Sequence, residues 1–321
     1  MLLIRSEDVD RLGTVELGLA AARETAGLVV AGEFFTGRVQ VEDATATAWT
    51  RMLVGILPEL DLIGYKQFHR VGQDVRYRVS LFRHSDGEPL GIVDGRRITS
   101  LRTSSTAALS FAHVFGDDPV ALAIVGSGEE AREGVRAVNG ATKLASAVVF
   151  SPTPANRDAL AAEIRDEHGV EATTAASVEE ALAGANAAYV ATASRTSFVG
   201  GPGTADLRLL AAVGATRPDH HELLPEVLTA ASQVVVDCDD ALEEPGDVID
   251  AIAAGFDAKS AFLLGDWLEQ DPPAAGDGSV VFKSIGSVEQ DLVLARHLPL
   301  AAQAEGSGDE IEDVASLRVM R

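Results

Sequence analysis

The chain has very little cysteine: Cys238 is the only one in 321 residues. A single thiol cannot close an intrachain disulfide or supply the ligands of a cysteine-based zinc site. Long apolar runs are also absent, since no stretch approaches the roughly 18 residues of a membrane span and the opening segment turns acidic at Glu7 and Asp8. These absences predict a soluble protein of the cytoplasm.

Basic residues are also scarce in this chain. The chain has 26 Lys and Arg against 49 Asp and Glu, a formal net charge of -23, and its lysines are confined to positions 66, 143, 259 and 283. Such a surface repels nucleic acid and anionic membranes, so we expect neither as a partner. An acidic surface with arginine in place of lysine suits solubility in concentrated salt, where self-repulsion is screened. The composition therefore indicates a salt-adapted (halophilic) protein, with an ordinary acidic protein as the alternative.

The first third of the chain combines a helix with antiparallel strands. Residues 15–30 carry apolar side chains at helical spacing, and the pattern ends near Gly32. Residues 75–101 alternate in the manner of strands and are interrupted at 85–87 and again at Asp94 and Gly95. Both interruptions have the composition of hairpin turns. An antiparallel meander is therefore expected here.

From about Asp117 the pattern changes to apolar strand, turn and helix. Strands are expected at 120–125, 145–151, 187–193, 208–214, 232–238 and 279–286, and helices at 128–138, 156–167 and 288–298. Alternation of this kind predicts a parallel sheet with helices on both faces. The final stretch, 304–321, is polar and acidic, and we expect part of it to be mobile.

A glycine motif follows the first of these strands. Gly126 suits a tight turn, Gly128 lets the pyrophosphate of a dinucleotide approach the backbone, and the small Ala131 permits close packing of strand and helix. Together with Ser127 and Glu129, these residues open a helix whose N-terminus offers N–H groups to an anion. The order of strand, motif, helix and second strand predicts a Rossmann-type dinucleotide site, with a ligand-free turn as the alternative.

The end of the second strand bears on which dinucleotide is bound. NAD-specific sites usually place a carboxylate there, against the ribose hydroxyls. In this chain the strand is followed by Ser151, Thr153 and Arg157, with no carboxylate before Asp158. Hydroxyls and a guanidinium suit a 2′-phosphate, so we favour NADP, with NAD as the alternative. Arg157 as a solvated residue of the first helical turn is the competing interpretation.

Two isolated cations precede the glycine motif. Arg102 stands before the hydroxyl-rich run 103–106, where we expect a strand to end and a helix to begin. A bidentate guanidinium beside a helix N-terminus makes an anion site. Lys66 is a lone lysine in a largely apolar strand, and a lysine so placed donates a proton or holds a carboxylate. The alternative for each is an exposed charge that faces water.

The loop 213–223 contains two adjacent histidines, His220 and His221. The sequence offers them no third ligand at a suitable spacing, so we expect no metal site and interpret them as surface residues of a loop.

Six segments together resemble a known family. Residues 64–66, 94–108, 125–131, 213–223, 234–248 and 281–292 follow the order and spacing of the ornithine cyclodeaminase/mu-crystallin family. The resemblance implies a homodimer whose first domain, built from both chain ends, forms the dimer interface and much of the substrate site. It therefore implies an α/β chain with an α+β domain of antiparallel sheet, residues 1–115 with 292–321, around a Rossmann-type doubly wound domain, residues 116–291.

The resemblance also implies roles on the substrate side. Lys66 matches the lysine that touches the substrate near the reacting centre, and Arg102 matches the arginine that binds the substrate carboxylate. A second carboxylate-binding arginine is expected upstream, for which Arg38 is the candidate and Arg51 the alternative.

On the cofactor side, the resemblance places Thr103 near the cofactor phosphates. It assigns the lining of the nicotinamide to Thr192, Ala193, Ser194 and Gly286.

Thr216 decides between the branches of that family. Its cyclodeaminases carry an essential Asp at this position, and a threonine hydroxyl cannot take up a proton at neutral pH without a base. The loop therefore resembles that of the ketimine reductase branch, which implies NAD(P)H-dependent reduction of a small imine 2-carboxylate such as pyrroline-2-carboxylate or piperideine-2-carboxylate. Lys66, Arg102 and Thr216 are the candidate catalytic residues.

Three alternatives stay open. The first is an NAD(P)-dependent dehydrogenase of the alanine type. The second is an ornithine cyclodeaminase, an ammonia lyase in which Asp219 replaces the missing carboxylate. The third is a non-catalytic, NADPH-dependent ligand binder.

Overall fold

The computed structural model describes residues 1–45 and 47–312, so the end of the tail whose mobility was predicted, 313–321, lies outside the described residues. The chain forms two compact units, which we call unit 1, Met1–Arg102 with the segment from Val288 onward, and unit 2, Thr103–Ser287. Helix α3 (Ile98–Phe115) begins in unit 1 and ends in unit 2. None of the described helices is long and apolar enough to cross a membrane.

Unit 1 is built on a seven-stranded sheet of order β17-β1-β6-β5-β4-β3-β2. Its strands are β1 (Leu2–Ile4), β2 (Phe35–Glu42), β3 (Ala48–Leu57), β4 (Leu62–Val71), β5 (Asp74–Arg83), β6 (Pro89–Asp94) and β17 (Asp309–Glu310). Strands β2 to β6 pair antiparallel in sequence order, which confirms the predicted antiparallel sheet. Its helices are α1 (Ser6–Leu12), α2 (Val15–Ala31), the 3-10 turn Pro58–Leu60 and α11 (Val288–Glu305).

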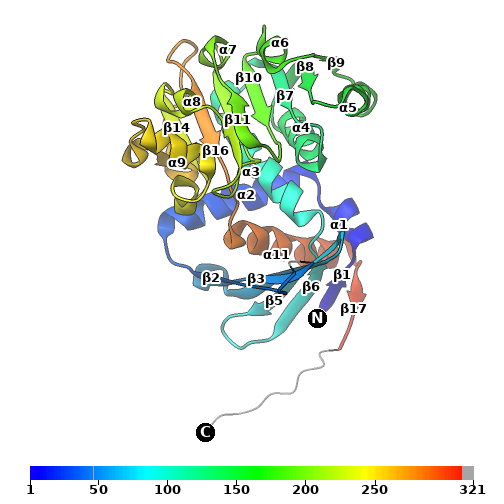
Figure 1. Cartoon of the computed structure of the whole chain (residues 1–321). Helices are drawn as coiled ribbons and strands as arrows, with labels where there is room; N and C mark the ends of the chain where they lie inside the picture. The colour runs from blue at the N-terminus through cyan, green and yellow to red at the C-terminus, as the bar shows by residue number, and fades with distance from the viewer. Residues whose placement is uncertain (46, 313–321) are drawn as a thin grey trace. The chain divides into compact units, whose positions relative to one another are not determined.

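Local chemistry explains how these helices begin and pack. The Thr14 side chain caps α2 by accepting a hydrogen bond from the Leu17 N–H, and Gly32 ends the helix at φ 70°, as the sequence predicted. Helix α11 lies against one face of the sheet (Figure 1), where a Cβ at Gly55 or Gly64 would come within 2.9 Å or 2.7 Å of the Leu292 methyl groups. Glycine at these two positions therefore allows the helix to approach the strands.

One predicted turn is wrong. Asp94 and Gly95 do not form a hairpin, because α3 begins three residues later at Ile98. Ile98 and Leu101 are both fully buried at helical spacing, and this packing overrides the strand preference of the β-branched residues around them. Arg102 is consequently in the second turn of a helix and not at its start. The N–H groups that follow it are engaged in the helical ladder, so the predicted anion site at a helix start is also wrong.

Unit 2 contains an eight-stranded parallel sheet of order β15-β14-β16-β12-β10-β7-β8-β9. Its strands are β7 (Pro119–Val125), β8 (Lys143–Phe150), β9 (Glu171–Thr174), β10 (Ala187–Val190), β12 (Leu209–Ala212), β14 (Gln233–Val236), β15 (Phe262–Leu263) and β16 (Val280–Lys283). The run β9-β8-β7-β10-β12 has the 3-2-1-4-5 order of a doubly wound fold, which confirms the predicted fold class. A separate parallel pair joins β11 (Arg195–Val199) to β13 (His221–Leu223).

Both faces of the unit 2 sheet are covered. Every residue of β10, β12 and β16 is buried, as expected for parallel strands between two layers of helices (Figure 1). The helices are α4 (Glu129–Ala141), α5 (Pro154–His168), α6 (Val178–Leu182), α7 (Pro202–Ala205), α8 (Pro225–Thr229), α9 (Gly246–Ala253) and α10 (Leu264–Leu268), with 3-10 turns at Asp239–Leu242 and Ala258–Ser260.

Candidate active site

Lys66 lies buried in unit 1, with 3% of the residue exposed. Because side chains alternate along β4, it shares a face with Gly64 and points to the side covered by α11. Its Nζ donates to Asp291 Oδ1 at 2.8 Å and to Thr99 Oγ1 at 2.7 Å. Burial with a carboxylate partner excludes the alternative of a strand lysine facing water.

Arg102 joins the same group. Its Nε lies 3.5 Å from Asp291 Oδ1, and its Nη1 donates to Gln290 Oε1 at 3.2 Å. We call Lys66, Thr99, Arg102, Gln290 and Asp291 the Lys66 cluster. Two cations share one carboxylate in it, and all three charged side chains are largely buried. An ammonium and a bidentate guanidinium held this close suit a carboxylate, to which both can donate.

Both candidates for the second arginine lie on the Lys66 face of the sheet. Arg38 is aligned with Lys66 across the strands, since each pairs with Leu53 of β3. Arg51 lies one row further along, where its Nε donates to Gln40 Oε1 at 2.8 Å and its guanidinium is 5.5 Å from the centre of the Phe68 ring.

The glycine motif of unit 2 fits a dinucleotide. Gly126 has φ 123°, and a Cβ there would come 2.2 Å from the Ala191 carbonyl oxygen, so only glycine fits. Gly128 caps α4 and borders open space, which leaves room for a phosphate beside the N–H groups of the first turn. Glu129 begins α4 and Ala131 is buried within its first turn. Thr103, the other predicted phosphate neighbour, is buried in α3.

The end of β8 brings hydroxyls and an arginine together. Ser151 Oγ and Ser127 Oγ are 2.9 Å apart, and Arg157 Nη1 donates to the Ser151 carbonyl at 3.3 Å. Arg157 Nε is buried without a hydrogen-bond partner among the described residues. Thr153 is exposed at the start of α5. Arg157 is therefore held over the strand end and is not simply a solvated helix residue.

Glu222 anchors the predicted nicotinamide segment. Its Oε1 accepts from the Thr192 N–H at 2.6 Å and from Thr192 Oγ1 at 2.9 Å, while Oε2 accepts from the N–H groups of Gly214 and Ala215, each at 2.9 Å. Burial raises the pKa of the Glu222 carboxyl, and the charge of Lys283 and these hydrogen bonds oppose the rise. The carboxylate thus ties the end of β10 to the loop that contains Thr216.

A buried ion pair between Lys283 and Asp247 stabilises the same loop. Both side chains are fully buried, and Lys283 Nζ lies 3.2 Å from Asp247 Oδ2. Lys283 Nζ also donates to the Ala215 carbonyl at 2.7 Å, while Asp247 Oδ1 accepts from the Glu222 N–H at 2.6 Å. The pair therefore links β16, α9 and the loop.

The other predicted nicotinamide neighbours are held by local hydrogen bonds. The Gly286 N–H donates to Asp237 Oδ2 at 2.8 Å, and Ser284 Oγ donates to the same oxygen at 2.7 Å. Ser194 Oγ donates to the Thr196 carbonyl at 2.7 Å, and Ala193 is exposed beside it.

Thr216 lies half-buried in the loop after β12, without a carboxylate in its position. Asp219, the possible replacement, forms an ion pair with Arg195 at 3.3 Å and has a largely exposed side chain. His221 pairs with Asp250 at 3.0 Å, and His220 lies 3.2 Å from Arg217. No group of three or more metal-ligating side chains is present in the part of the chain that the structure describes.

Several partners of the site were not predicted from the sequence: Thr99, Glu222, Asp237, Asp247, Lys283, Gln290 and Asp291. One signal was available, since Lys283 is a lone lysine in an apolar strand of a lysine-poor chain, as Lys66 is. The acidic partners carry no such mark in a chain with 49 acidic residues.

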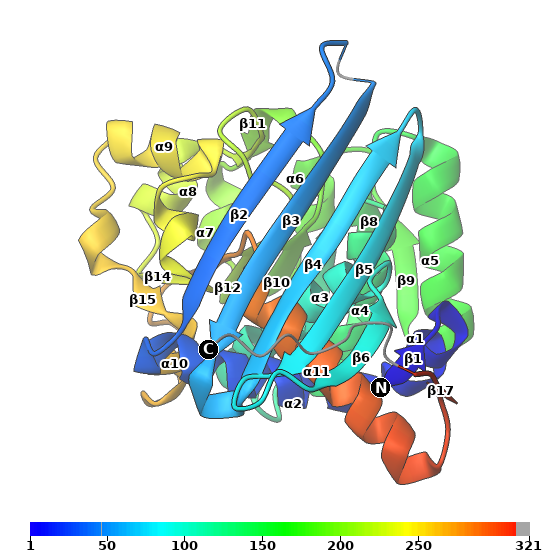
Figure 2. The same cartoon turned by 90° about the horizontal axis from the view of Figure 1, so that it is seen from below.

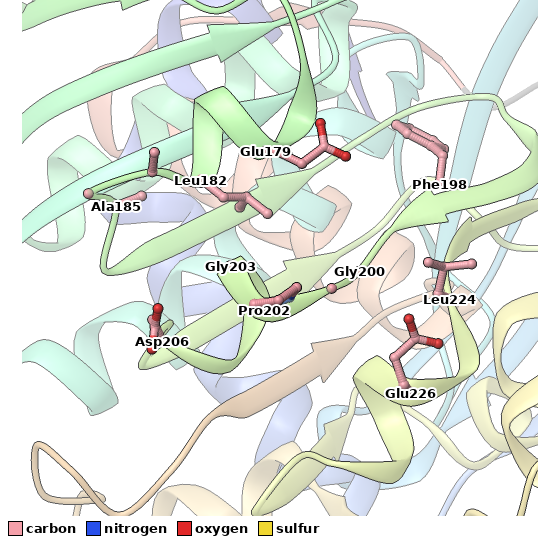
Figure 3. A pocket seen from close by; sticks show the side chains of 13 residues that line it. Glu179, Leu182, Ala185, Phe198, Gly200, Pro202, Gly203, Asp206, Leu224 and Glu226 are labelled. Atoms are coloured by element: carbon pink, nitrogen blue, oxygen red, sulfur yellow. The ribbon is translucent and has the colours of Figure 1, made fainter.

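A hollow of about 640 Å³ in unit 2 is not the cofactor site (Figure 3). It lies at the amino ends of the parallel strands, because Ala185 precedes β10 and Asp206 precedes β12. The glycine motif lies at the carboxyl ends, because Gly126 follows β7. Its lining includes the carboxylates of Glu179, Asp206 and Glu226, which would repel phosphates.

The sequence and the fold both match known proteins. The profile of the ornithine cyclodeaminase/mu-crystallin family matches residues 65–301. The chain is 28% identical over 265 residues to Delta(1)-pyrroline-2-carboxylate reductase of Bacillus cereus, covering 81% of this chain and 79% of that protein. It is 26% identical over 312 residues to ketimine reductase mu-crystallin of Macropus fuliginosus, covering 91% and 95%.

A solved structure agrees on the fold. Thermococcus litoralis Delta(1)-pyrroline-2-carboxylate reductase, in complex with NADH and L-proline, superposes with a TM-score of 0.87 at 22% identity, covering 97% of this chain and 100% of that one.

Proposed function

The chain belongs to the ornithine cyclodeaminase/mu-crystallin family, and we propose that it is an NAD(P)H-dependent reductase of small imine 2-carboxylates. Pyrroline-2-carboxylate and piperideine-2-carboxylate are the expected substrates, and proline and pipecolate the products. The Lys66 cluster carries this proposal, because it brings an ammonium, which is a proton donor, and a guanidinium to the same carboxylate in a largely buried position. The names of the reductase relatives support it.

In this proposal, residues of unit 1 bind the substrate carboxylate and protonate the imine nitrogen. Arg102 and Lys66 bind the 2-carboxylate by donating hydrogen bonds to its oxygens. The Lys66 ammonium, fixed by Thr99 and Asp291, keeps the imine nitrogen protonated, which makes the imine carbon more electrophilic. The glycine motif would hold a dinucleotide, which would supply the hydride for the reduction. Iminium and hydride together give the amino acid, and no further base is needed.

The lyase alternative lacks its carboxylate. Thr216 cannot accept a proton at neutral pH, and Asp219 is occupied by Arg195 at the exposed side of the loop. We therefore place the reductase ahead of the cyclodeaminase.

The first experiment follows oxidation of NADPH and NADH by the purified protein with pyrroline-2-carboxylate, piperideine-2-carboxylate, and pyruvate with ammonia. Concentrated potassium chloride is included because the net charge of -23 calls for screening. Turnover of the cyclic imines supports the reductase. Turnover of pyruvate and ammonia alone replaces it with an alanine-type dehydrogenase. Ammonia release from ornithine without net cofactor change identifies a lyase, and tight ligand binding without turnover identifies a binder.

NADP is the proposed cofactor, because the end of β8 presents Ser151 and Arg157 and no carboxylate. Arg157→Ala is expected to raise KM for NADPH about 10- to 100-fold, the loss of a charged hydrogen bond of roughly 1.5–3 kcal/mol, and to leave KM for NADH nearly unchanged. Steady-state kinetics with both cofactors measure this. An equal rise for both, or none, would contradict the assignment.

We also propose a homodimer that forms through the face of the unit 1 sheet opposite Lys66. In Figure 2 the strands β2 to β5 lie in front of α11, and no described helix of unit 1 covers their near face. Valines and a phenylalanine are exposed on this face: Phe35, Val39, Val41, Val54 and Val71. Exposed apolar side chains gathered on one face of a sheet are typical of an interface.

Val39→Glu tests the dimer, because it places a charge among the exposed apolar side chains of β2 on this face. We expect the molar mass measured by light scattering after gel filtration to halve. Val30→Glu, at an exposed valine of α2, is the matched control and should keep the mass of the wild type. A wild-type monomer, or a dimer that Val39→Glu leaves intact, would refute the proposal.

A further inference from the structure

Cations gather on part of the Lys66 face although the chain is strongly acidic. The strand register aligns three rows of residues across β2 to β5 on this face, those that contain Lys66, Phe68 and Arg70. These rows contribute four cations, Arg38, Arg51, Lys66 and Arg70, and one carboxylate, Glu42. A chain with 49 acidic and 26 basic residues would not place four cations together by composition alone. Asp291 offsets the charge of Lys66, so these rows add Arg38, Arg51 and Arg70 against Glu42, an excess that favours anions next to the Lys66 cluster.

Aromatic rings fill the space between these charges. Phe68 and Tyr77 stack with ring centres 5.4 Å apart, and Trp49 meets Phe68 edge-on at 5.5 Å. Lys66 Nζ lies 5.8 Å from the centres of both the Phe68 and Tyr77 rings, and the Arg51 guanidinium lies 5.5 Å from that of Phe68. We call Trp49, Phe68 and Tyr77 the aromatic floor. It extends from the Lys66 amine towards Arg51.

We propose that Arg51 determines which side chain the substrate carries, an inference that rests on the proposed imine reduction. A substrate whose carboxylate is bound by the Lys66 cluster presents the rest of its carbon skeleton to the aromatic floor. An uncharged ring packs on Phe68 and Tyr77, and a side-chain carboxylate gains the Arg51 guanidinium. A side-chain ammonium or guanidinium meets Arg51, which stays charged at all accessible pH values, so it is rejected by repulsion.

The test compares substrates that share the 2-carboxylate and differ in the side chain. The wild type, Arg51→Gln and Arg51→Glu are assayed with piperideine-2-carboxylate and with the imines that form in ammonia from 2-oxoglutarate and from 2-oxo-5-guanidinopentanoate. The wild type should prefer the ring and the acidic imine over the guanidinium imine by at least about 10-fold in kcat/KM. Arg51→Gln should shift the ratio of guanidinium to acidic imine about 10-fold towards the cation, and Arg51→Glu about 100-fold.

Matched controls separate this role from others. Arg23→Glu makes the same charge change at an exposed residue of α2 and should leave the ratio unchanged. An equal loss for all imines in Arg51→Gln would mean that Arg51 holds the shared 2-carboxylate, and it would overturn the inference while the reductase function stands. An unchanged ratio in both variants would overturn it too. A wild type that reduces no imine refutes the proposed function and this inference with it.

Discussion

Lys66→Met is expected to lower kcat/KM for imine reduction at least about 100-fold, as the loss of a positioned proton donor generally does. The substitution keeps the length of the side chain, but it removes the ammonium that Asp291 and Thr99 hold in place. Asp291 retains Arg102 as a partner, so the fold should persist. Steady-state kinetics with piperideine-2-carboxylate measure the loss, and NADPH binding, followed by fluorescence, should be unchanged because the glycine motif belongs to unit 2.

Lys143→Met provides the control for this prediction. Lys143 is an exposed lysine paired with Asp117 at 3.1 Å, and it has no role in the proposed binding of substrate or cofactor. Its loss should leave kcat/KM within about twofold, as surface pairs contribute little. If Lys66→Met kept wild-type kcat/KM, Lys66 would be a structural residue and the proposed mechanism would fail.

Lys283→Met is expected to lower the free energy of unfolding by about 3–5 kcal/mol, the usual cost of breaking a buried ion pair by removing one partner. Asp247 would be left as a buried carboxylate without its cation, and the Ala215 carbonyl would lose its donor. Urea unfolding at constant potassium chloride measures the change. The loop with Thr216 should become more mobile as well, so activity should be lost at a lower urea concentration than the one that unfolds the whole chain.

A second variant checks the cause of that loss. Adding Asp247→Asn to Lys283→Met removes the stranded charge, while the amide oxygen still accepts from the Glu222 N–H. The double variant should therefore recover part of the stability. Lys259→Met, at an exposed lysine, should cost less than about 0.5 kcal/mol. A similarly small loss for Lys283→Met would show that the buried pair does not stabilise the loop.

The parallel strands and the glycine motif could be predicted because each is a local pattern. An apolar run that ends in Gly126 and Gly128 requires no knowledge of distant residues, and the structure has the strand, turn and helix in that order. The start of α3 could not be predicted in the same way. Ile98 and Leu101 suit a strand or a helix, and the choice depends on the core in which they are buried.

The catalytic candidates could be predicted from the sequence, but their hydrogen-bond and ion-pair partners could not. Scarcity of lysine in this chain was enough to single out Lys66, and the position of Thr216 in its loop was enough to argue against a lyase. Asp291 lies 225 residues from Lys66 in the chain, and nothing local distinguishes it from the other acidic residues.

The sequence by itself therefore determined the fold class, the dinucleotide motif and the identity of the isolated cations, since these depend on spacing and composition over short stretches. Only the tertiary structure decided which carboxylate stands beside each buried lysine and which side chains share the Lys66 face. The physical reason is that a charge is buried only with its counter-ion. That counter-ion is chosen by which strands and helices the fold brings into contact, and any of many acidic residues in the sequence would serve equally well.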